Sequence, residues 1–155
     1  MSFIITIILF FRMIQVTKIF RFEMAHAITG YDGPCKHIHG HSYVLHVTAT
    51  EKNGNDNYML APGFVIDFKD LKSIVNKSVI DQLDHKLVLS EAFLVRHPQA
   101  KQFENLVVWE MEPSAENMLV YISREIQKNL PENVLLTYLK IYETNNSYAE
   151  WINTN

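Results

Sequence analysis

Large apolar side chains occupy every second position within residues 16–28, and this alternation constrains the fold more than any other feature of the chain. Phe20, Phe22 and Met24 would share one face of an extended strand, because successive side chains of a strand point to opposite faces. The two residues that alternate with them, Arg21 and Glu23, are charged. The same spacing places His26 on the apolar face, which makes this histidine a candidate functional residue.

The rest of the chain predicts alternating groups of strands and helices. Strands are expected at about 39–51, at 106–111 and in the final part around 135–151, and residues 58–68 suggest another extended segment. Asp67 is a good N-cap for one helix, and Ser114 is a good N-cap for a second. The second helix has its apolar stripe at Ala115, Met118, Leu119, Ile122 and Ile126. Residues 91–105 are expected to be irregular. This order indicates an α+β sandwich with two helices on one face of an antiparallel sheet.

Length and charge limit the possible functions. The chain has 155 residues, which fits one domain, and its formal net charge of −3 offers no basic field for nucleic acid. Cys35 is the only cysteine, so the fold does not depend on a disulfide, and the cytoplasm is the default location.

The apolar run from Phe3 to Phe11 is too short for a membrane-spanning helix, which needs roughly 20 residues. It also lacks the preceding basic residue of a signal peptide. We therefore expect residues 1–12 to be an extension without chemistry, residues 13–155 to be a single domain, and no association with a membrane.

Three histidines form the strongest chemical signal. His39 and His41 are two positions apart on a predicted strand, so both imidazoles point the same way, and Gly40 leaves the opposite face open. With His26 they match the three-imidazole form of a catalytic zinc site, which keeps one coordination position free. A surface or core role is the alternative for any one of them. His37 has the same parity as His39 but lies in the preceding turn, and we rank it as a spare ligand.

Cys35 precedes His39 by four positions, so its thiol can reach the same pocket. It could be a catalytic base or nucleophile, a fourth metal ligand, or a buried small side chain. Asp84 and His85 could act together, with the carboxylate fixing the imidazole tautomer. Glu116 and Glu143 are candidate site carboxylates, although Glu116 also suits a helix N-terminus and Glu143 a solvated strand end.

A set of short motifs resembles the 6-pyruvoyltetrahydropterin synthase superfamily over nearly everything after Met13. The motifs are FEMAH at 22–26, C-x3-HGHSY at 35–43, GFVIDF at 63–68, LDH at 83–85, PSAEN at 113–117 and YET at 142–144. The resemblance implies the tunnelling fold, in which four-stranded antiparallel sheets with two helices on one face join into an oligomeric barrel. Two trimers stack into a hexamer, and the active sites lie between subunits.

The resemblance also implies residue roles. Zinc would be held by His26, His39 and His41, the catalytic set would be Cys35, Asp84 and His85, and Glu143 would anchor the pterin ring, near Ser114 and Glu116. The Glu143 carboxylate suits this role, because the 2-amino and ring N–H groups of a pterin are parallel donors for its two oxygens. Family members often have Thr where Ser114 stands, and Ser preserves the hydroxyl. Lys36 and Lys18 are guesses, from proximity, for contacts with the triphosphate.

The three-residue gap between Cys35 and His39 is similar to that of the bacterial 6-carboxytetrahydropterin synthases of queuosine biosynthesis. These lyases convert 7,8-dihydroneopterin triphosphate to 6-carboxy-5,6,7,8-tetrahydropterin, acetaldehyde and triphosphate. A 6-pyruvoyltetrahydropterin synthase of biopterin synthesis and a non-catalytic zinc- or pterin-binding protein are the alternatives.

Overall fold

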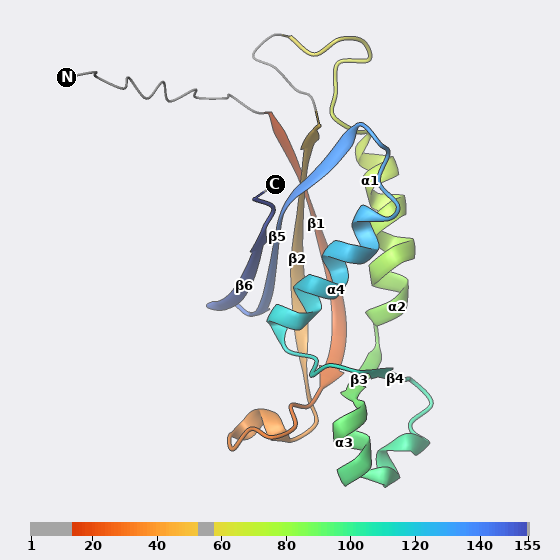
Figure 1. Ribbon diagram of the computed structural model, residues 1–155, viewed down its shortest axis with the longest axis vertical. Coiled ribbons are helices and arrows are strands. Elements are labelled where there is room, and N and C mark those ends of the chain that lie inside the picture. Colours follow the sequence, from red (N-terminus) through yellow and green to blue (C-terminus); the bar gives the residue numbers. More distant parts are fainter. Residues whose placement is uncertain (1–13, 53–57, 155) are drawn as a thin grey trace, which may run out of the picture.

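A six-stranded mixed sheet forms the body of the protein (Figure 1). The computed structural model describes residues 14–52 and 58–154, so the expected extension at 1–12 lies outside the described residues. Four strands are antiparallel neighbours, in the sheet order β1 (Gln15–His26), β2 (His39–Glu51), β5 (Val134–Thr144) and β6 (Ser147–Ile152). On the other side of β1, β3 (Lys86–Ser90) and β4 (Leu106–Trp109) continue the sheet as parallel strands.

Two helical segments lie on one face of the sheet, as the sequence predicts (Figure 1). The first is α1 (Phe68–Val75), which continues through a π-helical turn (Asn76–Ile80) into α2 (Asp81–Leu83). The second is α4 (Ala115–Gln127). Both predicted caps are confirmed, because Asp67 accepts a hydrogen bond from the Lys69 amide and Ser114 accepts one from the Asn117 amide.

The main core lies between these helices and the sheet. The apolar stripe predicted for α4 is buried throughout, and it meets the buried face of β1 and β2. Phe22 and Tyr43 stack across the two strands with ring centroids 5.1 Å apart. Burying large aromatic side chains in this way contributes strongly to stability. The helix layer therefore fixes which face of β1 and β2 is turned inward, and His26 lies on that face with 2% of its surface exposed.

The sheet differs from the four-stranded antiparallel sheet expected from the sequence, because it has six strands and is mixed. β3 was not predicted: it is short, and four of its five residues are buried, so it lacks the two-residue alternation that marks a half-exposed strand. β4 was predicted and is confirmed, although it ends at Trp109 rather than at residue 111.

Two further expectations about local structure are wrong. Residues 91–105 are largely helical rather than irregular, with α3 (Glu91–Arg96) and a 3₁₀ helix (Pro98–Gln102). The Ser90 hydroxyl caps α3 by accepting from the Phe93 amide at 3.1 Å. Residues 58–68 contain no strand, and α1 already begins at Phe68; their backbone turns at Gly63, whose φ of +83° suits glycine.

A 3₁₀ turn (Pro34–Lys36) lies in the connection between β1 and β2. Within the described part of the chain, no helix is both long and apolar enough to cross a membrane.

Candidate active site

The register of β1 and β2 brings three histidines together. His26 pairs directly with His39, and Met24 pairs with His41, so His41 lies on the diagonal from His26. One ligand nitrogen from each ring can be chosen so that all three lie within 4.8 Å of one another. His26 is buried and the other two are partly buried. The three histidines could therefore hold a metal ion.

Hydrogen bonds orient two of these rings for metal binding. His26 Nδ1 donates to the Pro113 carbonyl at 2.6 Å, and His39 Nδ1 donates to the His37 carbonyl at 2.8 Å. Each bond places the proton on Nδ1 and leaves Nε2 with a free lone pair, as a metal ligand requires. Burial lowers the pKa of His26 and of His41, which favours their neutral forms. The donor set and its supporting bonds fit a three-imidazole metal site.

Gly40 lies between two of these histidines and approaches the backbone of β1. A side-chain Cβ at this position would meet the Met24 carbonyl oxygen at 3.2 Å. Gly40 is exposed, and glycine permits the close approach of the two strands beside the histidines.

A cavity of about 470 Å³ adjoins the histidine cluster at His26 and is lined by most of the other candidates. Its lining includes the predicted residues His26, Cys35, Ser114, Glu116 and Glu143. These residues come from β1, the 3₁₀ turn, the N-terminus of α4 and the end of β5. The cavity thus joins a possible metal ligand, a thiol and two carboxylates from distant parts of the sequence.

Glu143 is aimed at the histidines by an irregularity in the sheet. The pairing of β5 with β6 shifts register between Tyr142 and Thr144, and such shifts re-aim side chains. Glu143 Oε1 lies 3.8 Å from His26 Nε2 and 3.5 Å from the Tyr43 hydroxyl, which donates to it. The carboxylate remains partly exposed, with 27% of its side chain accessible, so it can still receive donors from a ligand in the cavity.

Tyr43 is a site residue to which the sequence reasoning gave no role. It is fully buried, and its hydroxyl lies 3.4 Å from His26 Nε2. Burial, and next the Glu143 carboxylate, raise the pKa of this phenol, so Tyr43 is a neutral donor. Its position two residues after His41, on the same face of β2, was the available signal.

Cys35 lines this cavity from the 3₁₀ turn. Its backbone carbonyl accepts from the Ile28 amide at 2.8 Å, which ties the 3₁₀ turn to the end of β1. The side chain is a free, partly exposed thiol. Among the described residues, Cys35 is not part of the group whose ligand atoms lie within 4.8 Å of one another. The geometry therefore places this thiol on the cavity wall, outside the histidine cluster.

Asp84 and His85 form a separate pair that the single chain does not bring to this cavity. Asp84 Oδ1 lies 3.0 Å from His85 Nδ1 and accepts from the Glu23 amide at 2.9 Å. The Glu23 N–H is the main cause of the lowered pKa of Asp84. His85 has a left-handed backbone with φ of +58°, which is uncommon for a residue with a side chain. It lines another cavity, of about 320 Å³, beside His41 and Ser42.

Glu112 supports the site without lining the cavity, and it was not predicted from the sequence. Its carboxylate accepts from the Thr29 amide and from the Ser90 hydroxyl, each at 2.7 Å. Its carbonyl accepts from the Asn117 side chain at 2.9 Å. Glu112 thus links the end of β1 to β3 and to α4. Since it precedes Pro113, these bonds hold the carbonyl that orients His26.

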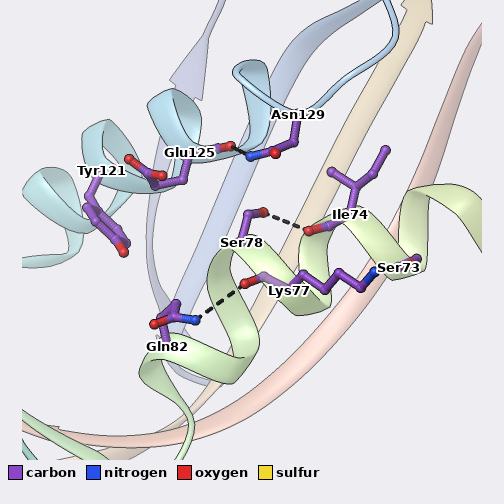
Figure 2. Close-up of a pocket in the computed structure, with 8 residues that line it drawn as sticks. All are labelled: Ser73, Ile74, Lys77, Ser78, Gln82, Tyr121, Glu125 and Asn129. Carbon is purple, nitrogen blue, oxygen red and sulfur yellow. Dashed lines mark hydrogen bonds between the residues drawn. The ribbon is translucent and has the colours of Figure 1, made fainter.

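A further cavity, of about 440 Å³, lies between the α1–α2 segment and α4 (Figure 2). Its polar side chains include Ser78, Gln82 and Asn129, and each donates a hydrogen bond to a backbone carbonyl of its own helical segment. None of the predicted site residues lines it. Figure 2 therefore shows a groove between helices in which these groups already have internal partners.

Comparison with known proteins gives a consistent result. The family model for 6-pyruvoyl tetrahydropterin synthase matches residues 15–153. The chain is 32% identical to the 6-carboxy-5,6,7,8-tetrahydropterin synthase of Rickettsia typhi, with 89% of this chain and 99% of that protein covered. It is 31% identical to the Haemophilus influenzae protein of the same name, with 90% and 99% covered.

Among solved structures, the 6-pyruvoyl tetrahydropterin synthase of Caenorhabditis elegans superposes with a TM-score of 0.68 at 19% identity. The superposition covers 94% of this chain and 100% of that one. The two chains therefore share the same fold.

Proposed function

Since the chain belongs to the 6-pyruvoyl tetrahydropterin synthase family, we propose that it is a zinc-dependent 6-carboxy-5,6,7,8-tetrahydropterin synthase acting in queuosine biosynthesis. The substrate would be 7,8-dihydroneopterin triphosphate, and the products would be 6-carboxytetrahydropterin, acetaldehyde and triphosphate. The observation that carries this proposal is the cavity in which Cys35 and Glu143 lie beside the histidine cluster. In this proposal Glu143 would be the pterin anchor and Cys35 the proton-transfer group, next to a metal position that the cavity reaches at His26.

Glu143 would bind the pterin ring. Its carboxylate would accept hydrogen bonds from the 2-amino and ring N–H groups, and the Tyr43 hydroxyl would hold it in place. Ser114 and Glu116 line the same cavity at the N-terminus of α4, so both can contact the ring. Bound in this way, the ring would direct its side chain toward the histidines and Cys35.

His26, His39 and His41 would hold zinc, which when bound supplies a Lewis acid that acidifies the hydroxyl groups of the substrate side chain. Cys35 would move a proton at the carbon skeleton next to the ring. Its partial exposure leaves the sulfur accessible to a ligand in the cavity. Buried His26 forms part of the wall of this cavity, and buried Tyr43 lies behind it, beside Glu143.

Asp84 and His85 would take part in the return proton transfer. The Asp84 carboxylate orients the imidazole through Nδ1, which leaves Nε2 for exchange with the substrate. Within one chain His85 lines a different cavity from Cys35, and Asp84 lines neither of the two. We therefore propose that the pair of one subunit completes the site of its neighbour in a trimer or hexamer, as the family resemblance implies.

Product analysis tests the proposal. The zinc-loaded protein is incubated with 7,8-dihydroneopterin triphosphate, and all products are identified by mass spectrometry. Acetaldehyde together with 6-carboxytetrahydropterin supports the proposal. A tetrahydropterin with a diketo side chain would instead indicate a 6-pyruvoyl tetrahydropterin synthase, the name carried by the Caenorhabditis elegans neighbour. No turnover, with zinc tightly bound, would indicate a non-catalytic binding protein.

A further inference from the structure

A second cavity lies directly beside the proposed active site. It has a volume of about 430 Å³, and it shares Ile28 and Tyr31 with the cavity that holds Cys35 and Glu143. Lys36, which follows Cys35 in the same 3₁₀ turn, lines it from one side. Arg96, in the last turn of α3, also lines it. The two cavities are therefore neighbours across a wall formed by residues 28 and 31.

The lining of this neighbouring cavity is basic. Lys36 and Arg96 are the lysine and the arginine of this lining, and Asp32 is the single carboxylate among its described lining residues. Asp32 is fully exposed, and its ion pair with Lys36 at 3.2 Å is a surface pair of small energetic value. A phosphate group with several charges can displace such a partner. His37 and His97 also line the cavity, but its basic character rests on Lys36 and Arg96.

The segment that carries Arg96 is held in place by packing and by hydrogen bonds. Phe93 is buried on the inner side of α3, and the Ser90 hydroxyl caps that helix while donating to Glu112. His97 follows α3 and packs at a tilt against Phe93, with ring centroids 4.5 Å apart. The segment that carries Arg96 is thus anchored both to the small core under α3 and to the residue that supports the histidine site.

The residues that line the two cavities match the parts of the proposed substrate. Glu143 and Cys35, assigned above to the pterin ring and its carbon side chain, line the first cavity, whereas Lys36 and Arg96 line the adjoining one. We propose that this second cavity is the subsite for the triphosphate chain, with Lys36 and Arg96 as its main contacts. Arginine suits bidentate binding of phosphate oxygens, and lysine binds phosphate as a point charge. This inference rests on the proposed function, because it takes the substrate from it.

Binding measurements on charge-removing variants test the subsite. Lys36→Gln, Arg96→Gln and the double variant are compared with Lys101→Gln, which removes a nearby charge on the 3₁₀ helix (Pro98–Gln102) outside the cavity lining. The zinc-loaded proteins are titrated calorimetrically with inorganic tripolyphosphate, 7,8-dihydroneopterin triphosphate and unphosphorylated 7,8-dihydroneopterin. Each cavity variant is expected to weaken binding of both triphosphates at least about tenfold, with dihydroneopterin binding unchanged. Lys101→Gln is expected to bind all three as the wild type does.

The outcomes distinguish a failure of the proposed subsite from a failure of the proposed function. Wild-type affinity for tripolyphosphate in both single variants, or equal losses for dihydroneopterin, would overturn the subsite, and turnover of the substrate by the same proteins would leave the function intact. Loss of tripolyphosphate binding in the cavity variants supports the subsite, even if the wild type gives no pterin product. In that case only the proposed reaction fails.

Discussion

Replacing Cys35 with alanine distinguishes a catalytic thiol from a metal ligand or a packing residue. The thiol lines the active-site cavity but lies outside the group of histidine nitrogens. Three imidazoles remain in the variant, so zinc is expected to stay bound at one equivalent per chain. The side chain is only partly buried, so its truncation is expected to change the free energy of unfolding by no more than about 1 kcal/mol.

Activity is expected to respond differently. General acid–base catalysis by a positioned side chain contributes about 10²- to 10⁴-fold, so kcat in Cys35→Ala is expected to fall at least about a hundredfold, or about 2.7 kcal/mol of barrier. Cys35→Ser is the matched control: it restores size and polarity but has a hydroxyl that ionises far less readily. We expect it to remain nearly as inactive as the alanine variant.

The assay combines metal analysis, thermal unfolding and steady-state kinetics on the same purified variants. Full zinc with lost turnover supports the catalytic role. Lost zinc would show that sulfur is a fourth ligand, and full activity with zinc retained would show that Cys35 only packs against the cavity. Either result would refute the role proposed for the thiol.

Three further outcomes are expected. His39→Ala and His41→Ala lose both zinc and activity, whereas His37→Ala keeps both in metal analysis and turnover assays, because only the backbone carbonyl of residue 37 contacts the cluster. Glu143→Gln weakens pterin binding about tenfold or more with zinc unchanged, since an amide donor replaces one acceptor; unaltered affinity by calorimetry would remove this residue from the pterin site. The lowered pKa of Asp84 stabilises the fold above its ordinary value of 3.8, and this stabilisation is lost as the pH falls through the lower folded value. The stability deficit of Asp84→Asn, measured by chemical denaturation, therefore shrinks on acidification, and a constant deficit would contradict the cause assigned to the shift.

Much of the fold follows from local patterns in the sequence. β1, β2 and the helix on Ser114 were predictable because each has one buried face, and burial of one face imposes a period of two on strands and of 3.6 on helices. β3 and α3 were missed for physical reasons. β3 is buried on both faces, so no alternation marks it, and α3 has six residues, which is too short for a clear helical period.

Some features of the candidate site were likewise predictable from the sequence, and others were not. The grouping of His26 with His39 and His41 was predictable, because it needs only strand parity and one hairpin. The role of Glu112 was not predictable, because it depends on three partners, Thr29, Ser90 and Asn117, that come from different elements. The separation of His85 from Cys35 could not be predicted either. It depends on how β3 is added beside β1, which no local pattern specifies.

The histidine cluster and the cavity wall differ in how far apart their parts lie along the chain. The three histidines belong to one hairpin, whereas Tyr43 and Glu143 meet across 100 positions of sequence. Closing a long loop costs more conformational entropy than closing a short one, so the hairpin can form before β5 docks. A slip of one residue between β1 and β2 would turn the histidines to opposite faces. A metal ion captured by the nascent hairpin would thus select the native register while the rest of the chain is still unfolded.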